Sequence, residues 1–177
     1  MALRSDRENA PVSPRRGWLI SAGLCLLSLS LSGCGKDPPP PPPPTIVNLK
    51  LSATGTANAM TDGRGAPVLV RVYQLGSKAA FEREDFFRIY KEDAAALGAD
   101  LLKKDEFLLI PGTAKTISLS PGPTVKALGV FAAYRDFQAV KWRVDTDIPP
   151  NQTTNLTLTA DRPGVALSPS GGKPAGP

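Results

Sequence analysis

The sequence predicts a mainly β protein, a β-sandwich of about seven to eight short antiparallel strands with one helical insertion. Two observations lead to this prediction. Apolar and polar residues alternate with period two in several short segments, which is the pattern of half-buried strands. One stretch, residues 77–104, has apolar residues at helical spacing instead. Short strands with one helical stretch are most economically arranged as two packed sheets.

The first two strands are predicted at residues 46–53 and 68–75, where apolar side chains recur at every second position. In the second strand Val68, Val70 and Val72 share one face, and Arg71 lies on the other. The intervening residues 55–67 have no apolar period and contain several glycines. They are therefore predicted to form an exposed loop.

Residues 77–104 form the predicted helical insertion. One apolar stripe recurs at spacings of three and four residues, formed by Phe86, Ile89, Tyr90, Ala94 and Leu97. Gly98 fits a helix end, and residues 99–103 are expected to add a further turn. We expect the aromatic side chains of this stretch to pack in the core rather than bind a ligand.

After the helical stretch the chain returns to strand patterns, at residues 106–110, 116–120, 125–134, 140–145 and 155–160. Residues 125–134 are apolar on both faces, which predicts a central strand covered on both sides, with the helical insertion on one of them. Trp142 alternates with its polar neighbours and is expected to pack in the core. The sandwich is predicted to span residues 46–167, because residues 168–177 have almost no apolar content and form a predicted disordered tail.

The amino-terminal residues have the pattern of a lipoprotein signal peptide. An arginine pair precedes a Leu-rich run, residues 18–31, which is short for a membrane-spanning helix of about 20 residues. The run ends in Leu31-Ser32-Gly33-Cys34, the pattern of a bacterial lipobox. Small residues before the cysteine admit an extended backbone to the signal peptidase, and the thiol accepts diacylglycerol. Residues 1–33 are therefore a predicted cleaved signal, and Cys34 is the predicted lipidation site.

A spacer is predicted between the lipid and the sandwich, at residues 34–45. It contains seven consecutive prolines, Pro38–Pro44, which in polyproline II conformation reach about 20 Å. The residue after Cys34 is Gly35 and not Asp, so the common inner-membrane retention signal is absent. This favours the periplasmic face of the outer membrane. Residues 15–19 fit a general secretory signal and a twin-arginine signal equally well.

The composition argues against several classes of function. The chain has no histidine, which excludes histidine-based acid–base and nucleophilic catalysis and nearly all zinc sites. The densest group of its acidic residues lies in the helical stretch, where a solvated face is the usual explanation. We therefore expect no enzyme activity and no cofactor, apart from the covalent diacylglycerol and N-acyl lipid on Cys34.

Removal of the signal also changes the charge and the cysteine content. Residues 34–177 keep 17 basic and 14 acidic side chains and no run of basic residues, so no nucleic-acid partner is expected. Cys25 leaves with the signal, and Cys34 is the cysteine that remains. An intrachain disulfide is then impossible, so the apolar core must hold the fold unaided.

Several stretches are similar to one family in their order and spacing: Pro67–Leu75, Asp85–Phe87, Leu97–Leu102, Pro111-Gly112, Leu128–Asp136 and Trp142-Arg143. Together with the lipobox they cover roughly residues 46–160. On these residues the chain resembles the outer-membrane lipoprotein of the type VI secretion system, the TssJ family. The resemblance implies a transthyretin-like sandwich with a helical insertion. It also implies a role within a multimeric secretion complex, tethering the inner-membrane-spanning TssM subunit to the outer membrane.

The resemblance also implies a partner-binding site. In that family the loop between the first two strands carries much of the contact to the periplasmic part of TssM, and here this loop is residues 55–67. The implied partner-binding residues are Gly55, Thr56, Ala57, Asn58, Ala59, Met60, Thr61, Asp62, Gly63, Arg64, Gly65, Ala66 and Pro67. A long loop on a rigid sandwich is, independently, a common place for recognition.

Two other classes of function stay open from the sequence. A small-molecule-binding or transport-accessory lipoprotein would use the sandwich interior or a cleft beside the helix, and it predicts a large apolar pocket. An enzyme on a transthyretin-like scaffold is the other alternative. The hydrolases of that scaffold depend on histidines, which this chain does not have.

Overall fold

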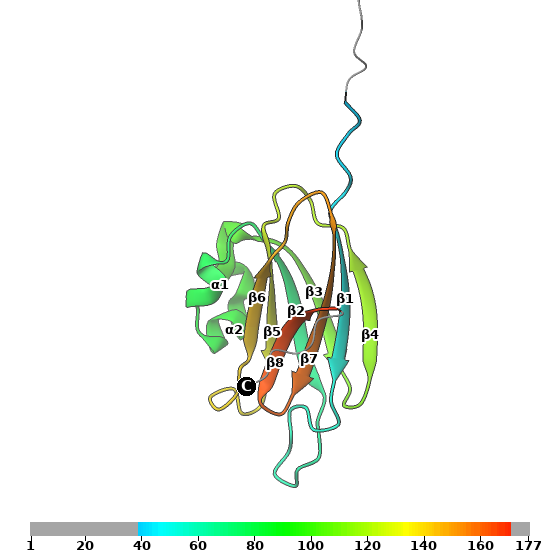
Figure 1. The fold of residues 1–177 in the computed structure, drawn as a ribbon. Helices are drawn as coiled ribbons and strands as arrows, with labels where there is room; N and C mark the ends of the chain where they lie inside the picture. Colours follow the sequence, from blue (N-terminus) through cyan, green and yellow to red (C-terminus); the bar gives the residue numbers. More distant parts are fainter. Residues whose placement is uncertain (1–38, 171–177) are drawn as a thin grey trace, which may run out of the picture. The chain divides into compact units, whose positions relative to one another are not determined.

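Two four-stranded β-sheets pack face to face in the computed structural model, which describes residues 39–170 (Figure 1). The elements in chain order are β1 (Ile46–Ala53), β2 (Val68–Leu75), α1 (Ala79–Arg83), α2 (Phe86–Leu97), η1 (Gly98–Asp100), β3 (Leu101–Leu109), β4 (Ala114–Leu119), β5 (Ala127–Ala133), β6 (Arg143–Asp147), β7 (Thr153–Asp161) and β8 (Gly164–Pro169). One sheet has the order β4-β1-β7-β8, and the other has the order β3-β2-β5-β6. The predicted mainly β sandwich with a helical insertion is confirmed.

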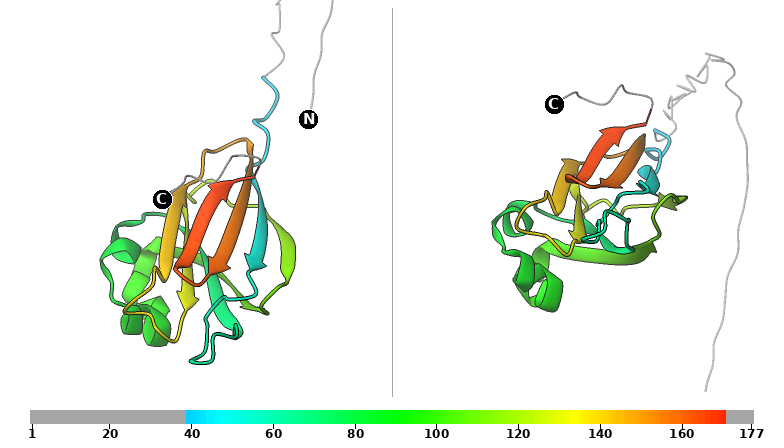
Figure 2. Two further views of the ribbon diagram at one scale, coloured as in Figure 1. Left: turned by 60° about the horizontal axis from the view of Figure 1, so that its bottom comes forward. Right: turned by 90° about the horizontal axis from the view of Figure 1, so that it is seen from below.

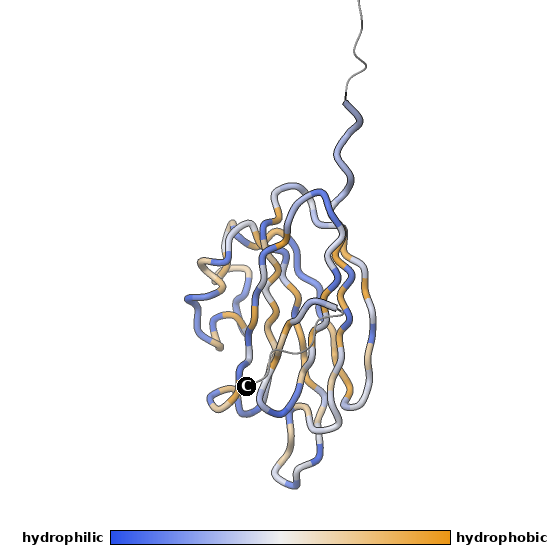
Figure 3. The backbone as a smooth tube through the Cα atoms, in the orientation of Figure 1, coloured by the Kyte–Doolittle hydropathy of each residue, from blue (hydrophilic) through white to orange (hydrophobic). Residues whose placement is uncertain are grey.

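Two clusters of buried apolar side chains hold these layers together. Along the strands, apolar residues alternate with polar ones, as the sequence predicts (Figure 3). The first fills the space between the sheets and includes Leu49 and Leu158 from one sheet and Val70 and Val130 from the other. The second lies between the β3-β2-β5-β6 sheet and the helices, where Phe131 of β5 is fully buried. Figure 2 shows the helical insertion on that outer face. β5 is thus covered on both sides, as predicted.

The strands are not all antiparallel, so that part of the prediction is wrong. β1 pairs antiparallel with β4 but parallel with β7, with Leu49 opposite Leu156. The chain reaches β7 from β6, which belongs to the other sheet, so no hairpin joins β7 to its neighbour β1. Both strands start at the same end of the sandwich and run in the same direction. A period-two pattern carries no information about this choice.

The helical insertion is shorter than predicted. Helix was expected to about Lys104, but α2 ends at Leu97, η1 covers the next three residues, and Lys103 and Lys104 lie in β3. Gly98 has a φ of +53°, which stops the helix where the sequence indicated an end. The following residues pair with β2, with Lys104 opposite Tyr73, because the sheet offers them backbone hydrogen bonds.

The carboxyl-terminal strand β8 was not among the strands predicted from the pattern. It pairs antiparallel with β7, with Leu167 opposite Leu158 and Ser168 opposite Thr157. The prediction of a disordered tail is therefore wrong at residues 168 and 169, because an edge strand can form through backbone hydrogen bonds with few apolar residues. Residues 1–38 and 171–177, which include the predicted signal, Cys34 and most of the tail, lie outside the described residues.

Arg71 of β2 holds α2 against the sheet. Its Nη1 donates to the carbonyl oxygens of Ile89 at 3.2 Å and Tyr90 at 2.9 Å, and its Nε donates to Glu106 at 2.8 Å. The helix is interrupted close by, at Glu92, whose φ and ψ are −139° and 41°. A helical carbonyl next to such an interruption needs another donor, and the guanidinium supplies it.

Asp93 completes this attachment from the helix side. Its carboxylate accepts a hydrogen bond from Tyr73 at 3.1 Å and from Lys104 at 2.9 Å, and it lies 3.4 Å from Arg71. Burial acts to raise the pKa of Asp93, but the bonds from Lys104 and Tyr73 and the charge of Arg71 outweigh it. The pKa of Asp93 therefore lies below its ordinary value.

This attachment predicts an acid-dependent stability. Because the folded-state pKa of Asp93 is lowered, its contribution is complete above about pH 3.9 and is lost as the pH falls through the folded value. We expect Asp93→Asn to lower the free energy of unfolding by about 2 kcal/mol at pH 7. The difference from wild type should shrink below about pH 4, as measured by urea unfolding across pH.

Glu92→Gln is the matched control, since Glu92 pairs with Arg88 on the exposed side of the same helix. An exposed pair of this kind contributes less than about 1 kcal/mol. An Asp93→Asn protein that lost the same free energy at pH 7 and pH 3 would contradict the prediction.

Candidate functional site

Four connections meet at one end of the sandwich, which we call the loop end: residues 54–67, 110–113, 134–142 and 162–163. Residues 40–45 enter β1 at the opposite end, and the long β1–β2 loop projects beyond the strands at the loop end (Figure 1). The eight residues of β1 separate the two ends by about 26 Å at roughly 3.3 Å per residue. The predicted partner-binding loop therefore lies at the end of the sandwich opposite to residues 40–45.

The β1–β2 loop has defined internal structure. The Met60 amide donates to the carbonyl oxygen of Arg64 at 2.8 Å, and the Gly63 amide donates to that of Met60 at 2.9 Å, which closes a tight turn. Arg64 Nε also donates to Asp62 at 2.7 Å. Gly65 lies so close to Gly55 that a Cβ atom on it would meet the Gly55 carbonyl oxygen at 2.4 Å. The two limbs of the loop are thus packed against each other.

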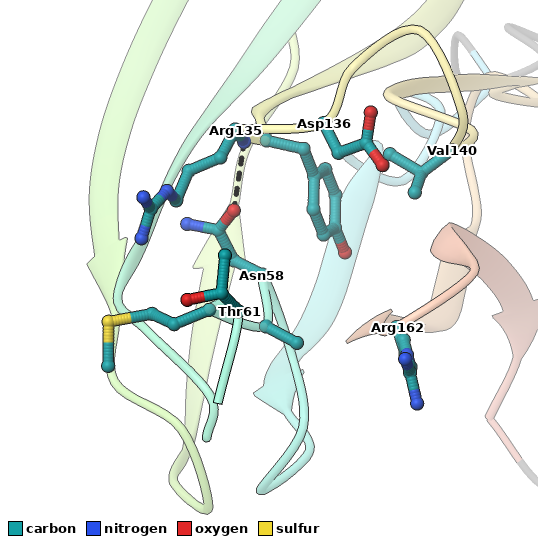
Figure 4. A pocket seen from close by; sticks show the side chains of 9 residues that line it. Asn58, Thr61, Arg135, Asp136, Val140 and Arg162 are labelled. Carbon is teal, nitrogen blue, oxygen red and sulfur yellow. Dashed lines mark hydrogen bonds between the residues drawn. The ribbon is translucent and has the colours of Figure 1, made fainter. Parts of the chain in front are cut away.

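Asn58 fixes the base of this loop to the neighbouring connection. Its side chain is buried, with 6% exposed, and its backbone has a φ of +50°. Nδ2 donates to the carbonyl oxygen of Pro67 at 2.8 Å, and Oδ1 accepts from the Arg135 amide at 2.9 Å (Figure 4). One buried amide therefore joins both limbs of the loop to the β5–β6 connection.

Asp161 ties the β7–β8 turn to the same loop. Its Oδ1 accepts from the hydroxyls of Thr54 at 2.5 Å and Thr56 at 3.1 Å and from the Arg162 amide at 2.7 Å. These hydrogen bonds to the charged form lower the pKa of Asp161. Tyr134 donates its hydroxyl to the Asp161 carbonyl oxygen at 2.9 Å, and burial raises the pKa of Tyr134 to about 12. Tyr134 is therefore a donor at neutral pH.

The structure divides the predicted partner-binding residues into two groups. Ala57 and Asn58 are buried and shape the loop from within, whereas residues 55–56, residues 61–64 at the tip and Pro67 are exposed; residues 59–60 and 65–66 are half-buried. A partner can reach the tip directly, whereas Ala57 at the base is fully covered. The sequence signal for the loop was its glycine content and its likeness to the family, and neither distinguishes base from tip.

Sequence reasoning missed the residues that lie beside the loop. A pocket of about 550 Å³ separates the loop from the β5–β6 connection and the β7–β8 turn, and Arg135, Asp136, Val140 and Arg162 help to line it. Arg135 and Asp136 were interpreted from sequence as a turn pair. Arg135 and Asn58 are 77 positions apart, so no local pattern relates them.

Other kinds of site are not seen in the described part of the chain. Within residues 39–170, no group of three His, Cys, Asp or Glu side chains could hold a metal ion. Among the helices of the same residues, none is long and apolar enough to cross a membrane. The loop end has ordered loops on a rigid support, which is a common place for recognition in proteins.

Comparison with known protein families shows to which family this chain belongs. The family model described as "Type VI secretion lipoprotein, VasD, EvfM, TssJ, VC_A0113" matches residues 45–163. The chain belongs to the TssJ family of type VI secretion lipoproteins. This is a family of membrane-bound secretion-system lipoproteins rather than an enzyme family. A search of curated proteins by sequence found no match.

Solved structures agree with membership in the TssJ family. The type VI lipoprotein TssJ1 from Pseudomonas aeruginosa is 34% identical, with 76% of this chain and 100% of that chain covered and a TM-score of 0.70. The Lip protein of Serratia marcescens, a membrane-bound component of the type VI secretion system, is 27% identical, with 71% and 96% covered and a TM-score of 0.65. A chain of a structure titled "Type VI membrane complex" shares the fold, at 22% identity, 71% and 98% covered and a TM-score of 0.60.

Proposed function

We propose that this TssJ-family protein anchors the type VI secretion membrane complex to the outer membrane by binding the periplasmic part of TssM with its β1–β2 loop. The observation that carries the proposal is the placement of that loop. It is ordered, it is exposed at its tip, and it projects from the end of the sandwich opposite residues 40–45. A protein held by its amino terminus at one membrane presents this end to a partner that comes from the other.

The predicted lipid and spacer fit this mechanical role. A single acyl chain binds a membrane only marginally, whereas the three chains predicted on Cys34 add about 0.8 kcal/mol per buried methylene and make the anchor durable. The proline run holds the sandwich away from the lipid headgroups. Anchoring also raises the effective concentration of the partner contact, so a modest interface can hold within a multivalent assembly.

A binding experiment tests the loop. In the test variant, residues 61–64 are replaced by Asn-Gly, which favours a two-residue hairpin turn, so that the tip is removed while Asn58 and the base stay intact. We expect the detergent-solubilised lipoprotein to bind the periplasmic part of TssM, and we expect the variant to lose at least tenfold in affinity. The reason is that the exposed tip is the part of the loop that a partner can reach.

The control is the double change Arg88→Ala and Glu92→Ala, which removes another exposed ion pair, at 2.6 Å, from α2 and leaves the net charge unchanged. It should bind like wild type, and all three proteins should melt within a few degrees of one another. Binding that survives removal of the tip would place the site elsewhere on the sandwich. If wild type does not bind, the tethering proposal fails and the alternative of a small-molecule-binding lipoprotein gains support.

A further inference from the structure

The pocket at the loop end has walls from three segments that are distant in sequence. Asn58 and Thr61 come from the β1–β2 loop, Arg135 and Asp136 from the β5–β6 connection, and Arg162 from the β7–β8 turn. Figure 4 shows Arg135 and Arg162 on opposite sides of the space, with Thr61 between them in the view. The pocket therefore adjoins the base of the loop that the proposed function assigns to the partner.

The charges that are free to meet a ligand here are mainly positive. The side chains of Arg135 and Arg162, which line the pocket, are exposed, and within residues 39–170 neither is in an ion pair. The acids nearby are largely engaged. Asp62 is paired with Arg64, and the carboxylate of Asp161 accepts from two threonine hydroxyls and an amide. Asp136 is the one acid among the pocket's lining residues.

The two arginines are attached to backbone that is already held in place. The Arg135 amide donates to Asn58, and the Arg162 amide donates to Asp161. The β5–β6 connection is also braced from its other side, where the ring of Phe137 stacks on that of Phe86 with centroids 4.2 Å apart. Binding therefore orders side chains but not loops, which keeps its entropic cost low.

We propose that this pocket receives an acidic peptide segment of the partner, with carboxylates placed against Arg135 and Arg162 while the loop tip makes a separate contact. The inference rests on the proposed function and extends its interface beyond residues 55–67. The pocket is lined by loop-end residues, Thr61 of the tip among them, so a protein that contacts the tip can reach it. Its positive charge selects carboxylates, and its mainly polar lining suits an extended peptide better than an apolar ligand.

Charge reversal tests the pocket separately from the tip. We expect Arg135→Glu and Arg162→Glu each to weaken binding of the periplasmic part of TssM by about tenfold at low salt, because attraction becomes repulsion. Their affinities should also depend less on NaCl than that of wild type, since fewer opposite charges are then screened. Arg83→Glu is the matched control: Arg83 is exposed on α1 and does not line the pocket, so this change should leave the affinity within about twofold.

The outcomes separate the two proposals. Weaker binding by both pocket variants, with Arg83→Glu unchanged and all melting temperatures held, supports the acidic segment. Wild-type affinity in both pocket variants, together with loss of binding when the tip is removed, overturns the pocket inference and leaves the tethering function standing. A wild-type protein that does not bind at all overturns both.

Discussion

Replacing Cys34 with serine is expected to release the protein from the membrane fraction and to abolish type VI secretion while the sandwich stays folded. The thiol is the predicted acceptor of diacylglycerol, and a serine hydroxyl in the lipobox does not replace it. Both apolar clusters lie within residues 47–167, so the fold does not depend on the lipid. Fractionation of cell membranes, a secretion assay and the melting temperature of the released protein measure the three parts of this result.

Cys25→Ser is the control for this experiment. Cys25 lies in the apolar run of the signal and is preceded by Ala22-Gly23-Leu24, which is a poor lipobox. We expect this variant to be acylated, localised and active like wild type. A Cys34→Ser protein that still sediments with the outer membrane and still supports secretion would contradict the anchor.

Asn58→Ala is expected to lower the free energy of unfolding by about 3 kcal/mol. The change leaves the Pro67 carbonyl oxygen and the Arg135 amide without their partner, and an unsatisfied buried group costs about 1–3 kcal/mol. Alanine also tolerates the left-handed backbone at φ +50° less well than asparagine. For a domain of this size the loss corresponds to a fall in melting temperature of about 10 °C.

Asn58→Gly separates the two contributions. Glycine adopts the positive φ without strain, so it should restore about 1 kcal/mol and leave the hydrogen-bond loss. Both variants should also bind the partner more weakly, because the loop and the β5–β6 connection are no longer joined. An Asn58→Ala protein with wild-type stability and wild-type hydrogen-exchange protection in residues 55–67 would show that Asn58 does not hold the loop.

Much of the fold could be predicted because buried positions are occupied by apolar residues, and these recur along the sequence with the period of the strand or helix. Val47, Leu49 and Leu51 alternate because one face of β1 contacts the other sheet, and residues 127–133 are continuously apolar because β5 is covered on both faces. Trp142 packs beside Phe86 and Phe131, as its place in the pattern indicated. These features depend on whether each residue is buried or exposed, and the polarity of its side chain indicates which.

The pairing of one strand with another is less evident from the sequence. Leu101 to Lys104 continue a helical stretch in sequence but form the start of β3, because β2 provides partners that the local pattern does not contain. Leu167 and Ser168 form part of β8 for the same reason. Local propensity is overruled wherever a neighbouring strand can satisfy the backbone.

By itself the sequence predicted the lipobox at Cys34 and the proline spacer, and it determined the strand alternation and the loop at residues 55–67, because each depends on neighbouring residues along the chain. The tertiary structure alone decided that β1 and β7 run parallel and that Asn58 meets Arg135. It also decided that Arg162 faces the same pocket. These relations join residues far apart in sequence, and they exist only after the two sheets have packed and brought the loops to one end.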